Sequence, residues 1–193
     1  MSKTKQISVI GIFSALATVL MLLEIPIPQL VGFKYDGSEI ATLIVGLMIG
    51  PWAGILAEII KDLLYFAIRG TDVVGLIMNL AAGIIFVGTA SMIYIRRKTK
   101  MRAIMSLIIA SILTTVGMAL LNIVVYPPYL HVSYAFILQN YLWIIVLFNL
   151  LKTIADSVVV FVVYKKISVF FKIENWEKKR IVEEKYESKN LPR

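Results

Sequence analysis

The sequence predicts an all-α, polytopic membrane protein with six transmembrane helices and with both termini in the cytoplasm. Three observations support this prediction. Apolar residues make up 59% of the 193 residues, whereas charged residues make up only 17%. The apolar residues gather in long runs of the kind that cross a bilayer. The basic residues lie mainly in the segments that flank those runs.

The apolar runs define the expected helices. These helices cover residues 6–25, 38–50, 51–68, 72–95, 102–126 and 137–171. They form a membrane domain over residues 1–172, and residues 173–193 follow as a charged cytoplasmic tail without apolar periodicity. We expect a loop of aromatic, charged and glycine residues over 29–37 and a stiff aromatic loop over 126–131.

The dipeptide Gly50-Pro51 decides the number of helices. If the chain formed one kinked span there, it would have five helices, and the basic loop 96–102 would lie opposite the basic N-terminus. If Pro51 instead opens a new helix, the two runs form a hairpin and there are six helices. In the six-helix arrangement only Lys34 and Arg69 of the 20 basic residues lie outside, so the positive-inside rule favours six.

The composition excludes several classes of function. The chain has no cysteine and a single histidine, so disulfides, thiolate chemistry and Cys/His zinc sites are excluded. It contains no phosphate-binding loop and no zinc- or serine-hydrolase motif. We therefore expect no enzymatic activity, no catalytic residues, no metal site and no resident cofactor. The net charge of +8 lies mainly beside apolar runs, which indicates a lipid bilayer rather than nucleic acid as the partner.

The first helix carries a pair of small residues. Gly11 and Ala15 are four residues apart and share a helix face, with Ser14 and Thr18 beside them. Small residues let another helix approach closely. The sequence leaves open whether that other helix belongs to this chain or to an external partner.

Charged residues interrupt the apolar runs in two places. In the third helix, the spacing of Glu58, Lys61 and Asp62 lets the lysine neutralise one or both acids on one face. This ion cluster is either structural or part of a ligand or coupling site. In the last helix, Lys152 and Asp156 are four residues apart and are expected to pair.

The polar residues of the last helix indicate a binding site. A charged side chain at bilayer depth is costly, so an intramembrane lysine points to a functional site. Asn149 and Lys152 share one helix face, and Asn122 near the outer end of the fifth helix would lie in the same outer half. Aromatic residues near the external loops are expected to supply the walls: Phe33, Tyr35, Tyr126, Tyr129, Tyr134, Phe136 and Trp143.

Aromatic walls with a few amides and one cation suit a flat, neutral, hydrogen-bonding ligand better than an inorganic ion. The pocket is expected to open to the outside and to be closed toward the cytoplasm. An aromatic belt at the membrane interface is the alternative explanation for some of these rings.

The polar motifs resemble those of a known family. They are Phe33-Lys34-Tyr35-Asp36-Gly37-Ser38-Glu39-Ile40 before a short helix, Gly46-x3-Gly50-Pro51-x2-Gly54, Lys61-Asp62, Asn122 before a Tyr/Pro segment, and Asn149-x2-Lys152. Over residues 1–172 this combination resembles the riboflavin-specific, RibU-type S-components of energy-coupling factor (ECF) transporters.

The resemblance implies a vitamin importer subunit of the plasma membrane. Such a subunit captures riboflavin from outside, beneath the loop between the first two helices, and docks onto a transmembrane coupling subunit with two ATP-binding subunits. It implies ligand contacts at Asn122, Asn149 and Lys152, and docking through Gly11 and Ala15. With the residues that the sequence itself singles out, the predicted substrate-binding set is Asn122, Asn149, Lys152, Tyr126, Asp36, Tyr35 and Asn79.

Two alternatives remain at this point. The first is an S-component for another vitamin or a nucleobase-like compound, because the residues of the pocket do not specify one ligand. The second is an ion-coupled secondary carrier that uses Glu58, Lys61 and Asp62 with Lys152 and Asp156 as its relay.

Overall fold

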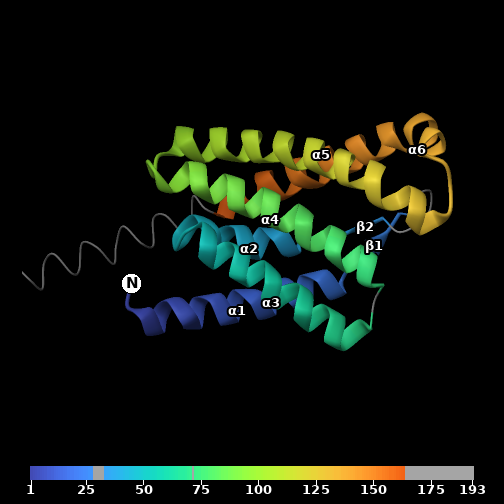
Figure 1. Cartoon of the computed structure of the whole chain (residues 1–193). Helices are drawn as coiled ribbons and strands as arrows, with labels where there is room; N and C mark the ends of the chain where they lie inside the picture. Colours follow the sequence, from blue (N-terminus) through green and yellow to red (C-terminus); the bar gives the residue numbers. More distant parts are fainter. Residues whose placement is uncertain (28–32, 71, 164–193) are drawn as a thin grey trace, which may run out of the picture.

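The computed structural model in Figure 1 describes residues 1–27, 33–70 and 72–163. It is helical except for one short ribbon of two strands. Its helices are α1 (Lys3–Leu22), α2 (Ser38–Met48), α3 (Pro51–Arg69), α4 (Val73–Ile95), α5 (Lys100–Leu130), α6 (Tyr134–Asn140) and a last helix described over Leu142–Val163. This last one is called the C-terminal helix below. The predicted tail and residues 164–171 of the predicted sixth helix lie outside the described residues.

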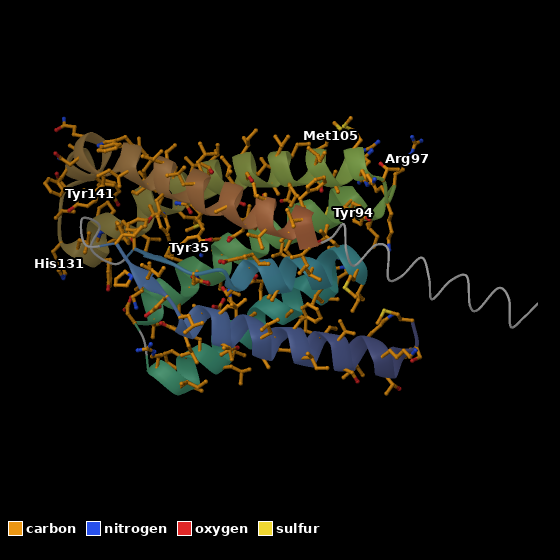
Figure 2. The ribbon with its side chains drawn as sticks, turned by 180° about the vertical axis from the view of Figure 1, so that it is seen from behind. Tyr35, Tyr94, Arg97, Met105, His131 and Tyr141 are labelled. Atoms are coloured by element: carbon orange, nitrogen blue, oxygen red, sulfur yellow. The ribbon has the colours of Figure 1, made fainter. Side chains whose placement is uncertain are left out.

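The long helices run back and forth along one common direction, as Figure 1 shows. The N-terminus and the junction between α4 and α5 therefore lie at the same end of the bundle. Figure 2 places Arg97 and Met105 at this end and His131 and Tyr141 at the opposite one. The short helix α2 contacts α1, α3 and α4 and is therefore an inner element of the bundle.

The main apolar core joins α2 to the second half of the chain. It comprises Leu43, Leu47, Phe86, Val87, Ala90, Tyr94, Ala103, Leu107, Ala110 and Val160. These residues come from α2, α4, α5 and the C-terminal helix, so burial of apolar area holds these four elements together.

The predicted hairpin at Gly50-Pro51 is confirmed. Gly50 adopts a φ of 142°, which side chains rarely tolerate, and Pro51 is the first residue of α3. A Cβ atom on Gly54 would lie 2.8 Å from the Cα atom of Gly46, so α2 and α3 are too close here for a side chain at residue 54. The two glycines make this tight crossing possible.

A small ribbon follows α1, which ends at Leu22 rather than at residue 25 as predicted. Strand β1 (Ile25–Pro26) pairs in antiparallel register with β2 (Lys34–Tyr35). The prediction of an irregular loop was therefore wrong for residues 34 and 35. Lys34 forms a 2.6 Å ion pair with Glu24, which ties the segment before β1 to β2.

The aromatic segment after residue 126 is helical, so the prediction of a loop there was wrong. Helix α5 continues through Pro127 and Pro128 to Leu130 and ends at His131, which adopts a left-handed φ of 55°. Proline has a φ near the helical value, but each one removes a backbone donor and crowds the carbonyl four residues earlier, and the helix ends two residues after Pro128.

The sixth predicted helix is interrupted. Helix α6 ends at Asn140, and the C-terminal helix begins after Tyr141, so the prediction of one helix from residue 137 was wrong. The side-chain amide of Asn140 donates to the carbonyl of Phe136 at 2.9 Å.

Four of the described helices are long and apolar enough to cross a membrane: Lys3–Leu22, Val73–Ile95, Lys100–Leu130 and Leu142–Val163. Helix α3 has 19 residues, but it carries Glu58, Lys61 and Asp62. Helix α2 has only 11 residues, which corresponds to about 16 Å of rise. Because α1, α3 and α4 surround α2, this short helix packs against protein on several sides.

Candidate functional site

The candidate site is organised around Lys152 of the C-terminal helix. Its Nζ donates to Oδ2 of Asp36 at 3.2 Å and to Oε1 of Glu39 at 2.9 Å. Asp36 precedes α2, and Glu39 lies in its first turn. Both carboxylates are buried. The ion pair therefore fastens the start of α2 to the C-terminal helix.

The predicted pair between Lys152 and Asp156 is wrong. Among the described residues, the ion pairs of Lys152 are those with Asp36 and Glu39. Oδ1 of Asp156 instead accepts a hydrogen bond from the hydroxyl of Tyr35 at 3.3 Å. The two carboxylates at the start of α2 each accept a charge-assisted hydrogen bond from Lys152, whereas Asp156 on the same helix would supply a single carboxylate.

Asp36 is held as an ionised partner. Its Oδ1 accepts the backbone N–H of Ser38 at 3.0 Å and also the Ser38 hydroxyl. Burial by itself would oppose ionisation, but Lys152, Lys61 and the Ser38 donors lower the pKa of Asp36 to about 2. The carboxylate is therefore charged at any ordinary pH.

Tyr35 connects the ribbon to the C-terminal helix. Burial, followed by the neighbouring Asp156 carboxyl, raises the pKa of Tyr35 to about 12. The phenol therefore keeps its proton and acts as the donor to Asp156. Figure 2 shows Tyr35 between the two ends of the bundle, on the side of His131.

A cavity of about 340 Å³ lies beside these contacts. Its lining combines mostly apolar residues with two polar ones: Ile27, Tyr35, Ile144, Leu147, Phe148, Leu151, Lys152 and Ala155. A volume of this size falls within the range of small-molecule pockets. Lys152 and Tyr35 are the predicted site residues that contact this cavity directly.

A second buried lysine lies next to the site. Nζ of Lys61 is 2.5 Å from Oε2 of Glu58 and 3.7 Å from Oδ1 of Asp62. It also donates to Oδ1 of Asn79 at 3.1 Å and to Oγ of Ser38 at 3.2 Å. The predicted pairing of Lys61 with at least one of these acids is confirmed, and Asn79 belongs to this cluster.

Glu39 joins the two lysines and was missed by the sequence analysis as a site residue. Its Oε1 is 2.9 Å from Nζ of Lys152 and 4.0 Å from Nζ of Lys61. It is the one acid within the apolar helix α2, which was a usable signal. An acid in such an apolar run needs a buried cation as its partner, and the sequence has two intramembrane lysines, Lys61 and Lys152.

The two asparagines are buried on their own helices. The side-chain amide of Asn122 donates to the Met118 carbonyl at 2.6 Å, and that of Asn149 donates to the Ile145 carbonyl at 2.8 Å. Neither residue belongs to the lining of the 340 Å³ cavity. Their role as ligand contacts therefore stays a prediction.

The predicted aromatic walls divide into two groups. Phe33 packs edge-on against Tyr126 and Phe148, at ring distances of 5.8 Å and 5.0 Å, and Tyr126 stacks on Tyr129. Because Phe148 lines the cavity, this group forms an aromatic support behind it. The other predicted rings, Tyr134, Phe136 and Trp143, are exposed on the surface.

The small residues of α1 face away from the bundle. Gly11 and Ala15 are exposed, and a Cβ atom built on Gly11 would meet nothing within 4 Å. Ser14 and Thr18 lie on the buried face of the same helix. Within the described part of the chain, the Gly11/Ala15 face is therefore free for an external partner.

A helical membrane domain with an apolar cavity and a buried lysine at its edge defines a membrane-embedded binding component. Residues 5–164 match the family described as "ECF transporter, substrate-specific component". The chain belongs to this family of transport subunits, and it is not an enzyme.

Two curated relatives have similar sequences. The riboflavin transporter RibU of Staphylococcus aureus (strain TCH60) is 32% identical over 179 residues, which are 89% of this chain and 95% of that protein. The riboflavin transporter FmnP of Bacillus subtilis (strain 168) is 33% identical over 130 residues, 65% of this chain and 68% of that protein.

One solved structure agrees with this assignment, and a second one shares the fold. A structure titled "Structure and mechanism of the S component of a bacterial ECF transporter" has a TM-score of 0.79 and 31% identity, and the match covers 89% of this chain and 99% of that one. ThiT from Listeria monocytogenes has a TM-score of 0.60 at 14% identity, covering 85% and 95% of the two chains. The ThiT similarity shows the fold alone.

Proposed function

We propose that this S-component captures riboflavin from outside the cell. The observation that supports this most is the similarity to RibU, which extends over 95% of that riboflavin transporter. The cavity beside Lys152 adds a physical argument, because its volume and its mixed lining suit a small organic molecule with one polar side.

The chemistry of the site fits a flavin. The dimethylbenzene end of the isoalloxazine ring would pack on the apolar and aromatic lining near Phe148. The ribityl hydroxyls would accept from Lys152, and the pyrimidine-like edge would pair with Asn122 and Asn149, whose amides both donate and accept. S-components for another vitamin or a nucleobase-like compound are the alternative within the family.

We further propose six transmembrane helices with both termini in the cytoplasm of a plasma-membrane protein. The alternating helix directions support an even number of crossings, with α2 as the one short pass among the described helices that run along the bundle. The basic N-terminus and the basic segment around Arg97 lie at one end, as the positive-inside rule requires. The ribbon and the site are then nearer the outer end.

The proposed partners are a transmembrane coupling subunit and two ATP-binding subunits. The chain has no nucleotide-binding loop of its own, so the energy must come from elsewhere. The exposed Gly11/Ala15 face would receive a helix of the coupling subunit, because small residues permit close approach.

Visible absorbance tests the ligand most directly. Protein purified in detergent from riboflavin-supplemented cells is expected to be yellow, and a Lys152→Ala variant is expected to lose most of the colour. A colourless protein that also shows no calorimetric signal with riboflavin would overturn the assignment. Transport by the isolated chain under an ion gradient would favour the secondary-carrier alternative instead.

A further inference from the structure

The surroundings of Lys152 contain more acid than base. The charged and titratable groups that face Asp156 are Tyr35 from the ribbon, Asp36 and Glu39 from the start of α2, and Lys152 from its own helix. Three carboxyl groups thus surround Lys152, and the nearest further cation, Lys61, lies 4.0 Å from Glu39 but already has Glu58 and Asp62 as partners. If all three were ionised, the cluster would hold a net negative charge in an environment that poorly solvates it.

The three carboxyl groups are not equivalent. Asp36 and Glu39 contact Nζ of Lys152 directly, at 3.2 Å and 2.9 Å, and Asp36 also accepts two donors from Ser38. Asp156 is fully buried, and within the described residues its hydrogen-bond donor is the Tyr35 hydroxyl. Its Oδ2 has no hydrogen-bond partner within the described residues. Asp156 is therefore the carboxyl group least able to remain ionised.

We propose that Asp156 carries a proton on Oδ2 in the folded protein at neutral pH, and that the neutral group holds Tyr35 and the ribbon against the C-terminal helix. A protonated Asp156 still accepts the Tyr35 hydrogen bond at Oδ1. It does not compete with Asp36 for Lys152, so both connections between the ribbon segment and the C-terminal helix persist together.

This proton makes the site sensitive to alkaline pH. An ionised Asp156 would add a third negative charge around Lys152 and weaken the attachment of Asp36, which leads directly from β2 into α2. Tyr35 and Lys152 both line the cavity, so its wall would loosen. The consequence for riboflavin rests on the function proposed above, whereas the proton itself does not.

The test compares unfolding midpoints of the full chain in detergent, without ligand, between about pH 6 and about pH 9. Asp156→Asn replaces the protonated carboxyl by a neutral group of the same shape. Asp72→Asn is the matched control, since Asp72 is an exposed helix cap and asparagine caps equally well.

The expected result is a stability difference that grows with pH. A folded state that retains a proton which the unfolded state has lost becomes less stable as pH rises, until the group ionises in the folded state too. Wild type should lose up to about tenfold in its folding equilibrium constant per pH unit relative to Asp156→Asn. Asp72→Asn should follow wild type.

An Asp156→Asn variant that is less stable than wild type by the same amount at every pH would overturn the proposal, because an ionised Asp156 predicts this. If the variant does not fold, infrared spectroscopy of wild type decides. A carboxylic-acid C=O band that disappears with the same pH dependence as the midpoint supports the proposal, and its absence at neutral pH overturns it.

Riboflavin titration separates this inference from the proposed function. Wild type should lose affinity above neutral pH, while Asp156→Asn keeps it. No binding by either protein at any pH would refute the proposed ligand but leave the stability comparison intact. Binding with the same pH dependence in both proteins would refute the role of the proton.

Discussion

Two buried lysines lie side by side in this protein, and they differ in the origin of their partners. Lys61 finds Glu58 and Asp62 on its own helix, and its side chain is 0% exposed. Lys152 finds Asp36 and Glu39 at the start of a distant helix, and its side chain is 10% exposed at the edge of a cavity.

The difference separates a structural ion cluster from a site that a ligand can reach. The two acids on α3 stay beside Lys61 however the neighbouring elements move, and Ser38 and Asn79 accept from it as well. The partners of Lys152 belong to a separate segment, so the same ion pairs act as a connection between two elements. A ligand in the cavity meets this connection and not the Lys61 cluster.

The largest effect is expected from Lys61→Met. Removing this lysine leaves Glu58 and Asp62 buried without their cation, which costs about 3–5 kcal/mol in the free energy of unfolding. Chemical or thermal unfolding in detergent measures this loss.

Lys34→Met is its control, because Lys34 is 43% exposed and its pair with Glu24 contributes at most about 1 kcal/mol. Equal losses in the two variants would contradict the contrast between buried and exposed pairs.

Lys152→Ala should affect the ligand more than the fold. The Lys152 side chain is 10% exposed at the edge of the cavity and that of Lys61 is 0% exposed, so the loss in unfolding free energy should be smaller than that of Lys61→Met. Riboflavin affinity should fall at least about tenfold, because a buried polar contact of the ligand is left unsatisfied. Isothermal titration calorimetry measures the affinity. Retained affinity would exclude Lys152 from the site.

Asn149→Ala should weaken riboflavin binding by about tenfold with little change in the unfolding midpoint. The chain offers a close control in Asn140, which makes the same bond to a carbonyl four residues earlier but lies on the surface. Asn140→Ala should leave affinity unchanged. If both variants bind like wild type, the predicted asparagine contact is absent.

The smallest effect on the isolated chain is expected on α1. Gly11→Leu points a bulky group into open space, so stability and riboflavin affinity should stay within about 1 kcal/mol of wild type. Uptake by cells that carry the whole transporter should nevertheless be lost, because the small face is blocked. Gly11→Ala keeps the face small and should transport. Full uptake by Gly11→Leu would show that the face is not a docking surface.

Of the two lysine sites, the spacing of residues along one helix predicted only the Lys61 cluster. The Lys61 cluster follows from residues three and four apart on a helix, and the hairpin at Gly50-Pro51 follows from the backbone preferences of glycine and proline. The same rule of spacing failed for Lys152 and Asp156, because partners from another element were available to the lysine. The backbone preference of proline also misled the prediction after Tyr126, where two prolines continue a helix instead of ending it.

The sequence by itself determined that the chain is a helical membrane protein, where most of its helices begin and end, and that a lysine and two asparagines lie within apolar helices. These properties depend on hydropathy and on neighbours along one helix. Only the tertiary structure decided that Lys152 joins Asp36 and Glu39, that Tyr35 bonds to Asp156, and that a cavity opens beside them. Those contacts span more than a hundred residues of sequence, and they depend on how each helix is rotated and packed against the others.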